Sequence, residues 1–338
     1  MLIGGKRHSI SLGFAGDVCL ADNYTPIETL AEIGSTDVSD GVDARFIDLM
    51  HGIDLMWVNC ESCFSDRGEP LPGKLYKFRA KTANVRYFAD LGVDIVGLAN
   101  NHVFDYGEQS FVDTLEALES AGIPYVGAGR NIAAAQAPVY LRANGLTVAY
   151  VAASRAEKFQ FTPEATDTAP GILLCYDNDR FIASIREAAS HADFVIALPH
   201  WGIERSAEPE EDQIESAHAY IDAGADAVMG AHTHCLQGIE FYRGRPIIYS
   251  LGNFWFDGYK GLTVVAELQL TTASEDDGRR NARLVLHPGW QSMAFTAWID
   301  APDDRASALR CIESISINAV IDEAGNVRQT GQASSRSM

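Results

Sequence analysis

Short apolar runs alternate with amphipathic stretches along most of the chain. Short apolar runs predict buried strands, and apolar residues that recur every three or four positions predict helices that cover a sheet. The expected strands span residues 9–15, 54–58, 94–98, 125–127, 138–141, 146–152, 194–198, 227–229, 247–249, 262–270 and 283–286. The expected helices span residues 42–50, 82–91, 109–120, 179–189 and 210–223.

This alternation of strands and helices predicts an α/β fold with a parallel portion. Asn144 and Gly145 form an Asn-Gly turn signal between two expected strands, so a hairpin and other antiparallel strands are expected as well. We expect a single domain over residues 9–300 with a helix over 301–324 packed on it. Residues 325–338 have no apolar periodicity and are expected to form a disordered tail.

Composition limits the class of partner. The chain has 338 residues, of which 46 are acidic and 26 basic, giving a formal net charge of −20. Its 47% content of hydrophobic residues is enough for a sizeable core, which argues against global disorder. Nucleic acids and anionic membrane surfaces are bound by basic surfaces, so neither is an expected partner. A small anionic substrate would need a local source of positive charge.

Membrane insertion and disulfide bonding are not expected. No apolar run reaches the ~18 residues that span a bilayer, and the N-terminal MLIGGKRHS lacks the apolar core of a secretory signal. The sequence therefore predicts a cytoplasmic chain or a leaderless mature form, and a homo-oligomer is compatible with it. Six cysteines in this length do not make a disulfide framework. Cys60 and Cys63 form a single C-x-x-C, for which buried, packed thiols are the simpler interpretation.

Side chains able to bind metals follow five of the expected strands. In open α/β sheets, ligand sites form beyond the carboxyl ends of strands, so these side chains are expected to gather. They are Asp17, Asn59, Glu61, Asn100, Asn101, His102, Asp105, His200, Glu204, His232 and His234. Each alone has an ordinary structural explanation, but together they predict a metal site. Mixed carboxylate, amide and imidazole donors suit one or two divalent ions of Mn, Fe or Zn better than Mg or Ca.

Seven motifs occur in order between residues 10 and 257. They are FAGDV, NCE, LANNHVFDYG, GAGRN, LPHWGIE, GADAVMGAHTHCLQGIE and IIYSLGNFWFD. Their wording and order resemble the poly-γ-glutamate capsule synthesis proteins of CapA type, a branch of the calcineurin-like metallophosphoesterase superfamily. The resemblance implies a four-layered α-β-β-α sandwich, in which two mixed sheets pack face to face between helices.

The resemblance also implies roles for individual residues. The expected metal ligands are Asp17 and His234 for the first ion, Asn101, His200 and His232 for the second, and Glu61 bridging both. His102 would act as the general acid or as the donor that stabilises a developing oxyanion, and Asp105 would orient its ring. Asn59, beside Glu61, and Glu204 are expected to contact the substrate.

One position departs from the ordinary metallophosphoesterases. Their first motif is Asp-x-His, whereas here Asp17 and Val18 are followed by Cys19. The first ion therefore loses an imidazole ligand, and a single tightly held ion is the alternative to two. A packed cysteine is favoured over a thiolate ligand because cysteine is commonly buried.

A basic segment, residues 74–81, carries four positive charges in this acidic chain. Lys77 and Arg79 alternate, so in an extended backbone they would point to one side, where Arg79 is expected to bind a carboxylate or phosphate. Arg155 is a second candidate for the same role. A solvated surface is the alternative for such a run.

These observations favour a metal-dependent hydrolase in which a metal-activated water attacks a small anionic or γ-glutamyl substrate, at a phosphoester or an amide bond. Two alternatives remain open. One is a non-catalytic or assembly component of poly-γ-glutamate capsule synthesis, and the other is a specialised biosynthetic enzyme acting on a small metabolite. The sequence contains no G-x-x-x-x-G-K-[ST] phosphate loop and no G-x-S-x-G nucleophile elbow.

Overall fold

The long first strand, β1 (Ser9–Val18), lies inside the larger of two mixed sheets. The computed structural model describes residues 9–156, 161–258, 260–272 and 281–331, and within these ranges the first sheet has ten strands. Its path is β19-β20-β17-β16-β1-β2-β5-β6, with β15 paired to β1 and β18 to β17. The other strands are β2 (Leu55–Cys60), β5 (Ile95–Gly97), β6 (Tyr125–Val126), β15 (Asn253–Trp255), β16 (Gly261–Thr271), β17 (Asn281–Gln291), β18 (Thr296–Trp298), β19 (Ala319–Ile321) and β20 (Asn326–Gln329).

The second sheet has the order β13-β14-β12-β11-β9-β8. Its four inner strands are parallel, and an antiparallel hairpin closes each edge. Its strands are β8 (Val139–Ala143), β9 (Leu146–Ser154), β11 (Phe194–His200), β12 (Ala227–Met229), β13 (Ile239–Tyr242) and β14 (Arg245–Ile248). Two short pairs lie beside the sheets: β3 (Cys63–Phe64) with β4 (Arg79–Ala80), and β7 (Ala128–Gly129) with β10 (Gly171–Ile172).

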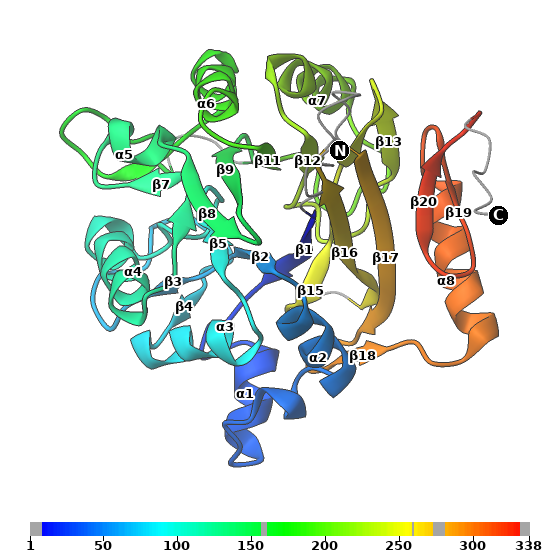
Figure 1. Ribbon diagram of the computed structural model, residues 1–338. Helices are drawn as coiled ribbons and strands as arrows, with labels where there is room; N and C mark the ends of the chain where they lie inside the picture. Colours follow the sequence, from blue (N-terminus) through cyan, green and yellow to red (C-terminus); the bar gives the residue numbers. More distant parts are fainter. Residues whose placement is uncertain (1–8, 157–160, 259, 273–280, 332–338) are drawn as a thin grey trace.

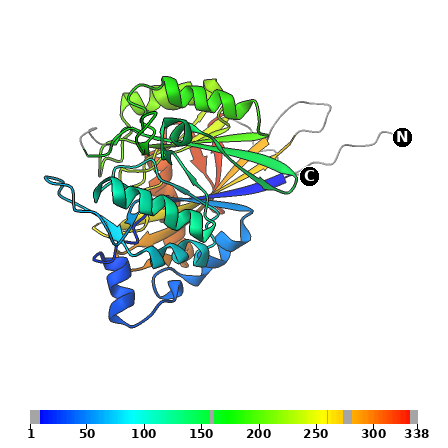
Figure 2. The same cartoon turned by 90° about the vertical axis from the view of Figure 1, so that its left-hand side faces the viewer.

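Helices cover the outer face of each sheet, on opposite sides of the molecule in Figures 1 and 2. The first sheet is covered by α1 (Thr25–Glu32), α2 (Ala44–Gly52), α3 (Arg86–Asp90) and α4 (Gly107–Ala121), and short 3-10 helices span Val38–Asp40 and Thr82–Val85. The second is covered by α5 (Ile132–Gln136), α6 (Asp179–Ala189) and α7 (Glu211–Ala223). The last helix, α8 (Pro302–Ser314), closes one end of the space between the sheets.

Three apolar layers hold these elements together. Phe14 and Trp57 of the first sheet pack in one buried cluster with Tyr150 of the second. A second cluster joins the first sheet to α1–α4, and a third joins the second sheet to α5–α7. Each sheet therefore buries both faces, which is why its inner strands are almost continuously apolar. The predicted four-layered α-β-β-α fold is confirmed.

The C-terminal segment differs from the prediction. The helix expected over 301–324 ends at Ser314, and the chain then forms the β19–β20 hairpin. The disordered tail expected over 325–338 is wrong for residues 325–331, because β20 pairs with β17 and buries Val327 against the space between the sheets. A strand with one buried apolar residue does not produce a repeating apolar pattern in the sequence, so this strand could not be predicted. Residues 332–338 lie outside the described part of the chain.

The helix expected over 82–91 is also different, since it is divided into the 3-10 helix Thr82–Val85 and α3. Within the described residues, no helix combines the length and the apolar character needed to cross a bilayer. A cytoplasmic location stays a prediction.

Candidate metal centre

The carboxyl ends of strands from both sheets meet at one buried place. Asp17, near the end of β1, is in register with Asn59 of the parallel strand β2, and Glu61 follows β2 directly. His200 is the last residue of β11, and His232 lies in the loop after β12. Parallel pairing brings these strand ends together, as the strand-end rule predicts.

Close backbone contacts hold the loops that carry the two histidines after β12. A Cβ at Gly16 would lie 1.8 Å from the Gly252 carbonyl oxygen, and a Cβ at Gly230 would lie 2.0 Å from that of Tyr249. His232 and His234 have φ values of +102° and +57°, which are unfavourable for residues with a side chain. Backbone strain of this kind persists where the surrounding structure fixes it, and it is common at functional sites.

The first group of candidate ligands consists of Asp17, Glu61 and His234. His234 Nδ1 lies 3.4 Å from Asp17 Oδ2, and His234 Nε2 lies 3.9 Å from Glu61 Oε1. Both carboxylates are fully buried. The amide of Asn59 donates to Asp17 Oδ1 at 2.8 Å and lies 3.3 Å from Glu61 Oε2, so it holds the two carboxylates in place.

The second group consists of Glu61, His200 and His232. His200 Nε2 lies 3.8 Å from Glu61 Oε1 and 2.8 Å from Asn101 Oδ1. His232 Nδ1 is buried and has no hydrogen-bond partner among the described residues. Five of the six sequence-predicted ligands therefore lie in two adjacent groups that share Glu61, and the sixth, Asn101, contacts His200 of the second group.

These distances fit one or two divalent cations. Metal bonds to nitrogen and oxygen are about 2.0–2.2 Å, so donors on opposite sides of one ion lie about 4.2 Å apart and neighbouring donors about 3 Å apart. Glu61 Oε1 is buried without a hydrogen-bond partner among the described residues, and its separations from His200 and His234 are too long for hydrogen bonds. A cation between these atoms would satisfy all of them, whereas a buried carboxylate left unpaired is costly.

The electrostatics of the site favour the same interpretation. Burial, together with the charge of Asp17, raises the pKa of Glu61 well above its ordinary value. Burial lowers the pKa of His200 and His232, and the neighbouring histidines add to the shift. Neutral imidazole is the form that binds a metal, and a nearby divalent cation would favour the ionised form of Glu61.

His102 faces this space from the first sheet. Its Nδ1 lies 2.7 Å from Asp105 Oδ2, and its Nε2 lies 3.9 Å from Glu61 Oε1. The backbone N–H of Phe78 also donates to Asp105 Oδ2, and the Phe78 ring packs against the imidazole at 4.0 Å. Asp105 therefore orients the ring, with Nε2 directed toward the candidate ligands. Burial lowers the pKa of His102, and Asp105 opposes that shift.

Lys74 is a site residue that the sequence analysis missed. Its ammonium lies 2.7 Å from Asp105 Oδ1 and also donates to the Asn101 carbonyl oxygen. The side chain is 4% exposed, so the ion pair is buried. Composition indicated only a basic segment, and nothing in the residue pattern distinguishes the buried Lys74 from the other basic residues of that segment.

Lys77 and Arg79 make other contacts in the structure, and their expected binding of a substrate stays a prediction. Lys77 Nζ donates to the Lys74 carbonyl oxygen at 2.7 Å, whereas the Arg79 guanidinium stacks over the Tyr106 ring at 4.2 Å. Lys77 and Arg79 would point to one side of an extended strand, but only Arg79 and Ala80 of this segment form a strand.

Two other predicted substrate residues lie at the edge of the site. The Arg155 guanidinium forms an ion pair with Asp212 of α7 at 2.7 Å. Glu204 is exposed, and its charge contributes to the raised pKa of Glu61 after burial and Asp17. Asn59 contacts the carboxylates, so its observed role is to position them, and contact with a substrate stays a prediction.

Cys19 is fully buried in a cluster with Ala21, Phe78 and Phe256, and neither candidate ligand group includes it. Burial raises the pKa of its thiol, which disfavours a thiolate. The packed interpretation of Cys19 fits these observations and stays a prediction.

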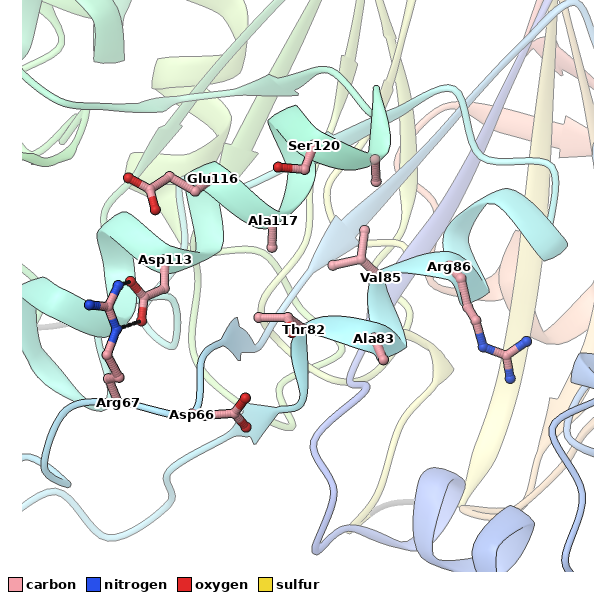
Figure 3. Close-up of a pocket in the computed structure, with 11 residues that line it drawn as sticks. Asp66, Arg67, Thr82, Ala83, Val85, Arg86, Asp113, Glu116, Ala117 and Ser120 are labelled. Carbon is pink, nitrogen blue, oxygen red and sulfur yellow. Dashed lines mark hydrogen bonds and ion pairs between the residues drawn. The ribbon is translucent and has the colours of Figure 1, made fainter.

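A surface cavity of about 760 Å³ lies elsewhere, between α4 and the Thr82–Val85 helix (Figure 3). An ion pair between Arg67 and Asp113 lies at one end of it. None of the predicted site residues lines this cavity.

Comparisons with known proteins agree with the motifs. The chain is 39% identical over 175 residues to the PGA biosynthesis protein CapA of Bacillus subtilis (strain 168), covering 52% of this chain and 45% of that protein. It is 32% identical over 222 residues to a probable polyglutamine synthesis accessory protein of Mycobacterium tuberculosis, covering 62% of this chain and 57% of that protein. The chain thus spans about half the length of these curated relatives.

Among solved structures, a putative 5'-nucleotidase from Staphylococcus aureus in complex with alpha-ketoglutarate superposes with a TM-score of 0.51 at 15% identity. The match covers 92% of this chain and 60% of that one, and it agrees with the metallophosphoesterase-like fold. Residues 11–258 match the family described as bacterial capsule synthesis protein PGA_cap, close to the span of the seven motifs. The chain belongs to this family.

Proposed function

We propose that this chain is a metal-dependent hydrolase that acts on an anionic substrate in poly-γ-glutamate biosynthesis. The observation that carries the proposal is the unpartnered Glu61 Oε1, which lies 3.8–3.9 Å from the Nε2 atoms of His102, His200 and His234. A divalent cation bound by Glu61 together with His200 or His234 would supply a Lewis acid and lower the pKa of a water, with His102 left free to move a proton. The names of the relatives support the biosynthetic context.

In this proposal, His102 moves a proton at Nε2. Its Nδ1–H donates to Asp105, so Nε2 is the atom that can accept a proton from the nucleophile or return one to the leaving group. The Asp105 carboxylate stabilises the charged imidazolium, and Lys74 fixes Asp105 from its other oxygen. Because Asp105 is itself fixed by Lys74, the His102 ring would keep one orientation through the reaction.

The proposed substrate is a small anion, with a phosphoester or a γ-glutamyl amide as the bond cleaved. Because the chain carries a net charge of −20, a bound cation would be the local source of attraction for such a substrate. Both reactions pass through a transition state whose developing negative charge the same cation can stabilise.

Activity measurements test this proposal. Purified protein is supplied with Mn²⁺ or Zn²⁺ and assayed on nitrophenyl phosphates and on γ-glutamyl peptides, together with His102→Ala and the matched variant His191→Ala. His191 is exposed and belongs to neither ligand group. We expect turnover of one substrate class, a loss of about 10²–10⁴-fold in His102→Ala, and no change in His191→Ala. No turnover of either class by metal-loaded protein would contradict the hydrolase proposal.

A second candidate function is a non-catalytic role in assembly of the polymer-synthesis machinery. The accessory role named for the mycobacterial relative favours it, and so does the absence of Cys19 from both candidate ligand groups. Polymer production in a host that lacks its own copy distinguishes the two. Full production by the His102→Ala variant would favour assembly, and loss of production with normal protein levels would favour catalysis.

A further inference from the structure

Asn253 lies beside Asp17 and His234, two of the three ligands of the first candidate cation site, yet it has no assigned role. It is the first residue of β15, and it pairs in parallel register with Asp17 of β1. The residue is 2% exposed, and its backbone carbonyl accepts a hydrogen bond from Thr263 Oγ1 at 2.6 Å. The strand and this backbone contact hold Asn253 firmly in place.

The side chain of Asn253 contacts the Nδ1 atom of His234. His234 Nδ1 lies 2.9 Å from Asn253 Oδ1 and 3.4 Å from Asp17 Oδ2. Because a carboxylate oxygen can only accept here, a proton on Nδ1 satisfies both contacts, and the amide of Asn253 must present its oxygen. His234 Nε2 is then unprotonated, 3.9 Å from Glu61 Oε1.

Asp17 alone is less suited to this task. Its Oδ1 already accepts from Asn59 at 2.8 Å, and its Oδ2 also faces the backbone N–H of His232 at 3.4 Å. The contact from Asn253 is the shorter of the two at His234 Nδ1. Phe256 packs on the imidazole at 4.7 Å but provides no polar contact that selects a tautomer.

His234 matters to this site because few other donors are present. Among the described residues, it is the only imidazole in the group with Asp17 and Glu61, and that group does not include Cys19. The side-chain nitrogen of Asn253, Nδ2, is buried without a hydrogen-bond partner in the described part of the chain. The packing of Asn253 therefore gives no other reason for an amide at this position.

We propose that Asn253 is a positioning residue of the first cation site: it holds His234 with Nδ1 protonated, so that Nε2 binds a divalent cation between His234 and Glu61. This inference rests on the metal site of the proposed function. Partners that orient a metal-binding histidine typically change metal affinity by about 10–100-fold when removed.

The test uses Asn253→Leu, which matches the shape of asparagine without an acceptor, and Asn253→Asp, which keeps the acceptor. Zn²⁺ affinity is measured by chelator competition in a His200→Ala background, where the second ligand group is disabled. We expect about 10–100-fold weaker binding in Asn253→Leu and retained or tighter binding in Asn253→Asp. Asn253→Ala gives the same comparison if leucine prevents folding. Affinities within twofold of the parent in the folded Leu or Ala variant would overturn the proposal.

A second readout needs neither metal nor activity. Nitrogen-15 spectra of histidine side chains in the metal-free protein report the His234 tautomer, with His234→Gln used for assignment. We expect Nδ1–H in the parent and in Asn253→Asp, and a shift toward Nε2–H in Asn253→Leu. An unchanged tautomer in Asn253→Leu would also overturn the proposal. If the parent binds no Zn²⁺ at all, the proposed function fails, but the tautomer comparison still decides the role of Asn253.

Discussion

His200 Nε2 lies 3.8 Å from Glu61 Oε1, across a space in which that carboxylate oxygen has no hydrogen-bond partner among the described residues. The distance is too long for a hydrogen bond and suits two donors of one ion. Glu61 belongs to both candidate ligand groups, so its charge is the element on which the site depends.

Glu61→Gln is expected to affect metal binding and the stability of the metal-free protein in opposite directions. Loss of the shared carboxylate should weaken binding of both ions by at least about 100-fold. Replacing a buried carboxyl whose ionisation is disfavoured should stabilise the metal-free protein by about 1–3 kcal/mol at neutral pH. Calorimetric metal titration and urea unfolding measure the two effects. Unchanged metal binding would contradict the bridging role.

The stability difference between Glu61→Gln and the parent should also depend on pH. Because the pKa of Glu61 is raised in the folded state, the folded protein binds more protons than the unfolded chain at this group. The stabilising contribution of the protonated carboxyl is therefore present below the ordinary pKa of about 4.5 and is lost as pH rises through the raised value. The advantage of Glu61→Gln in metal-free protein should grow as pH rises. A stability difference between the two proteins that does not change with pH would show that burial does not raise the pKa of Glu61.

The ion pair between Lys74 and Asp105 predicts a large stability effect. Lys74→Met leaves the buried Asp105 carboxylate without its cation, which should cost about 3–5 kcal/mol. Adding Asp105→Asn should recover part of the loss, because the unpaired charge is then removed. Lys77→Met is the matched control and should cost less than about 0.5 kcal/mol. Denaturant unfolding of the four proteins tests this, and equal effects at positions 74 and 77 would contradict the buried pair.

Thiol reactivity should distinguish packed cysteines from a redox pair. Burial raises the pKa of Cys60 and Cys63 to about 12, whereas Cys311 is exposed. We expect one rapidly reacting thiol in the native protein at pH 8 and all six after denaturation. Cys311→Ser should abolish the rapid reaction. Rapid modification of Cys60 or Cys63 in the native protein would support a redox role.

Val327 should matter to stability although it lies near the end of the chain. It is 4% exposed between the sheets, whereas Val320 on the partner strand is 43% exposed. Val327→Ala is expected to cost about 1–3 kcal/mol and Val320→Ala less than about 0.5 kcal/mol. Thermal unfolding of both variants measures the difference. Similar effects would show that the hairpin does not contribute to the core.

Much of the site could be predicted because its signals are local. Asp17, Glu61 and His200 each end or directly follow an apolar strand, and parallel pairing makes such strand ends converge. Asn253 follows the strand expected at 247–249 by the same rule, so the pattern contained that signal as well.

The remaining features depend on tertiary contacts that a residue pattern does not contain. Lys74 enters the site from an irregular loop, and only folding decides which of several lysines is buried against Asp105. Arg79 finds an aromatic partner in Tyr106, 27 residues further along the chain. Strand β20 exists because an edge of β17 is available to pair with it. Propensity alone is a weak guide in such segments.

Anomalous diffraction from crystals grown with Mn²⁺ tests the central claim most directly. We predict an anomalous peak about 2.0–2.3 Å from Glu61 Oε1, with His200 and His232 on one side or Asp17 and His234 on the other, and two peaks if both groups are filled. An ordered Glu61 hydrogen-bonded only to water, with no peak near either group at saturating Mn²⁺, would contradict a metal centre in this protein.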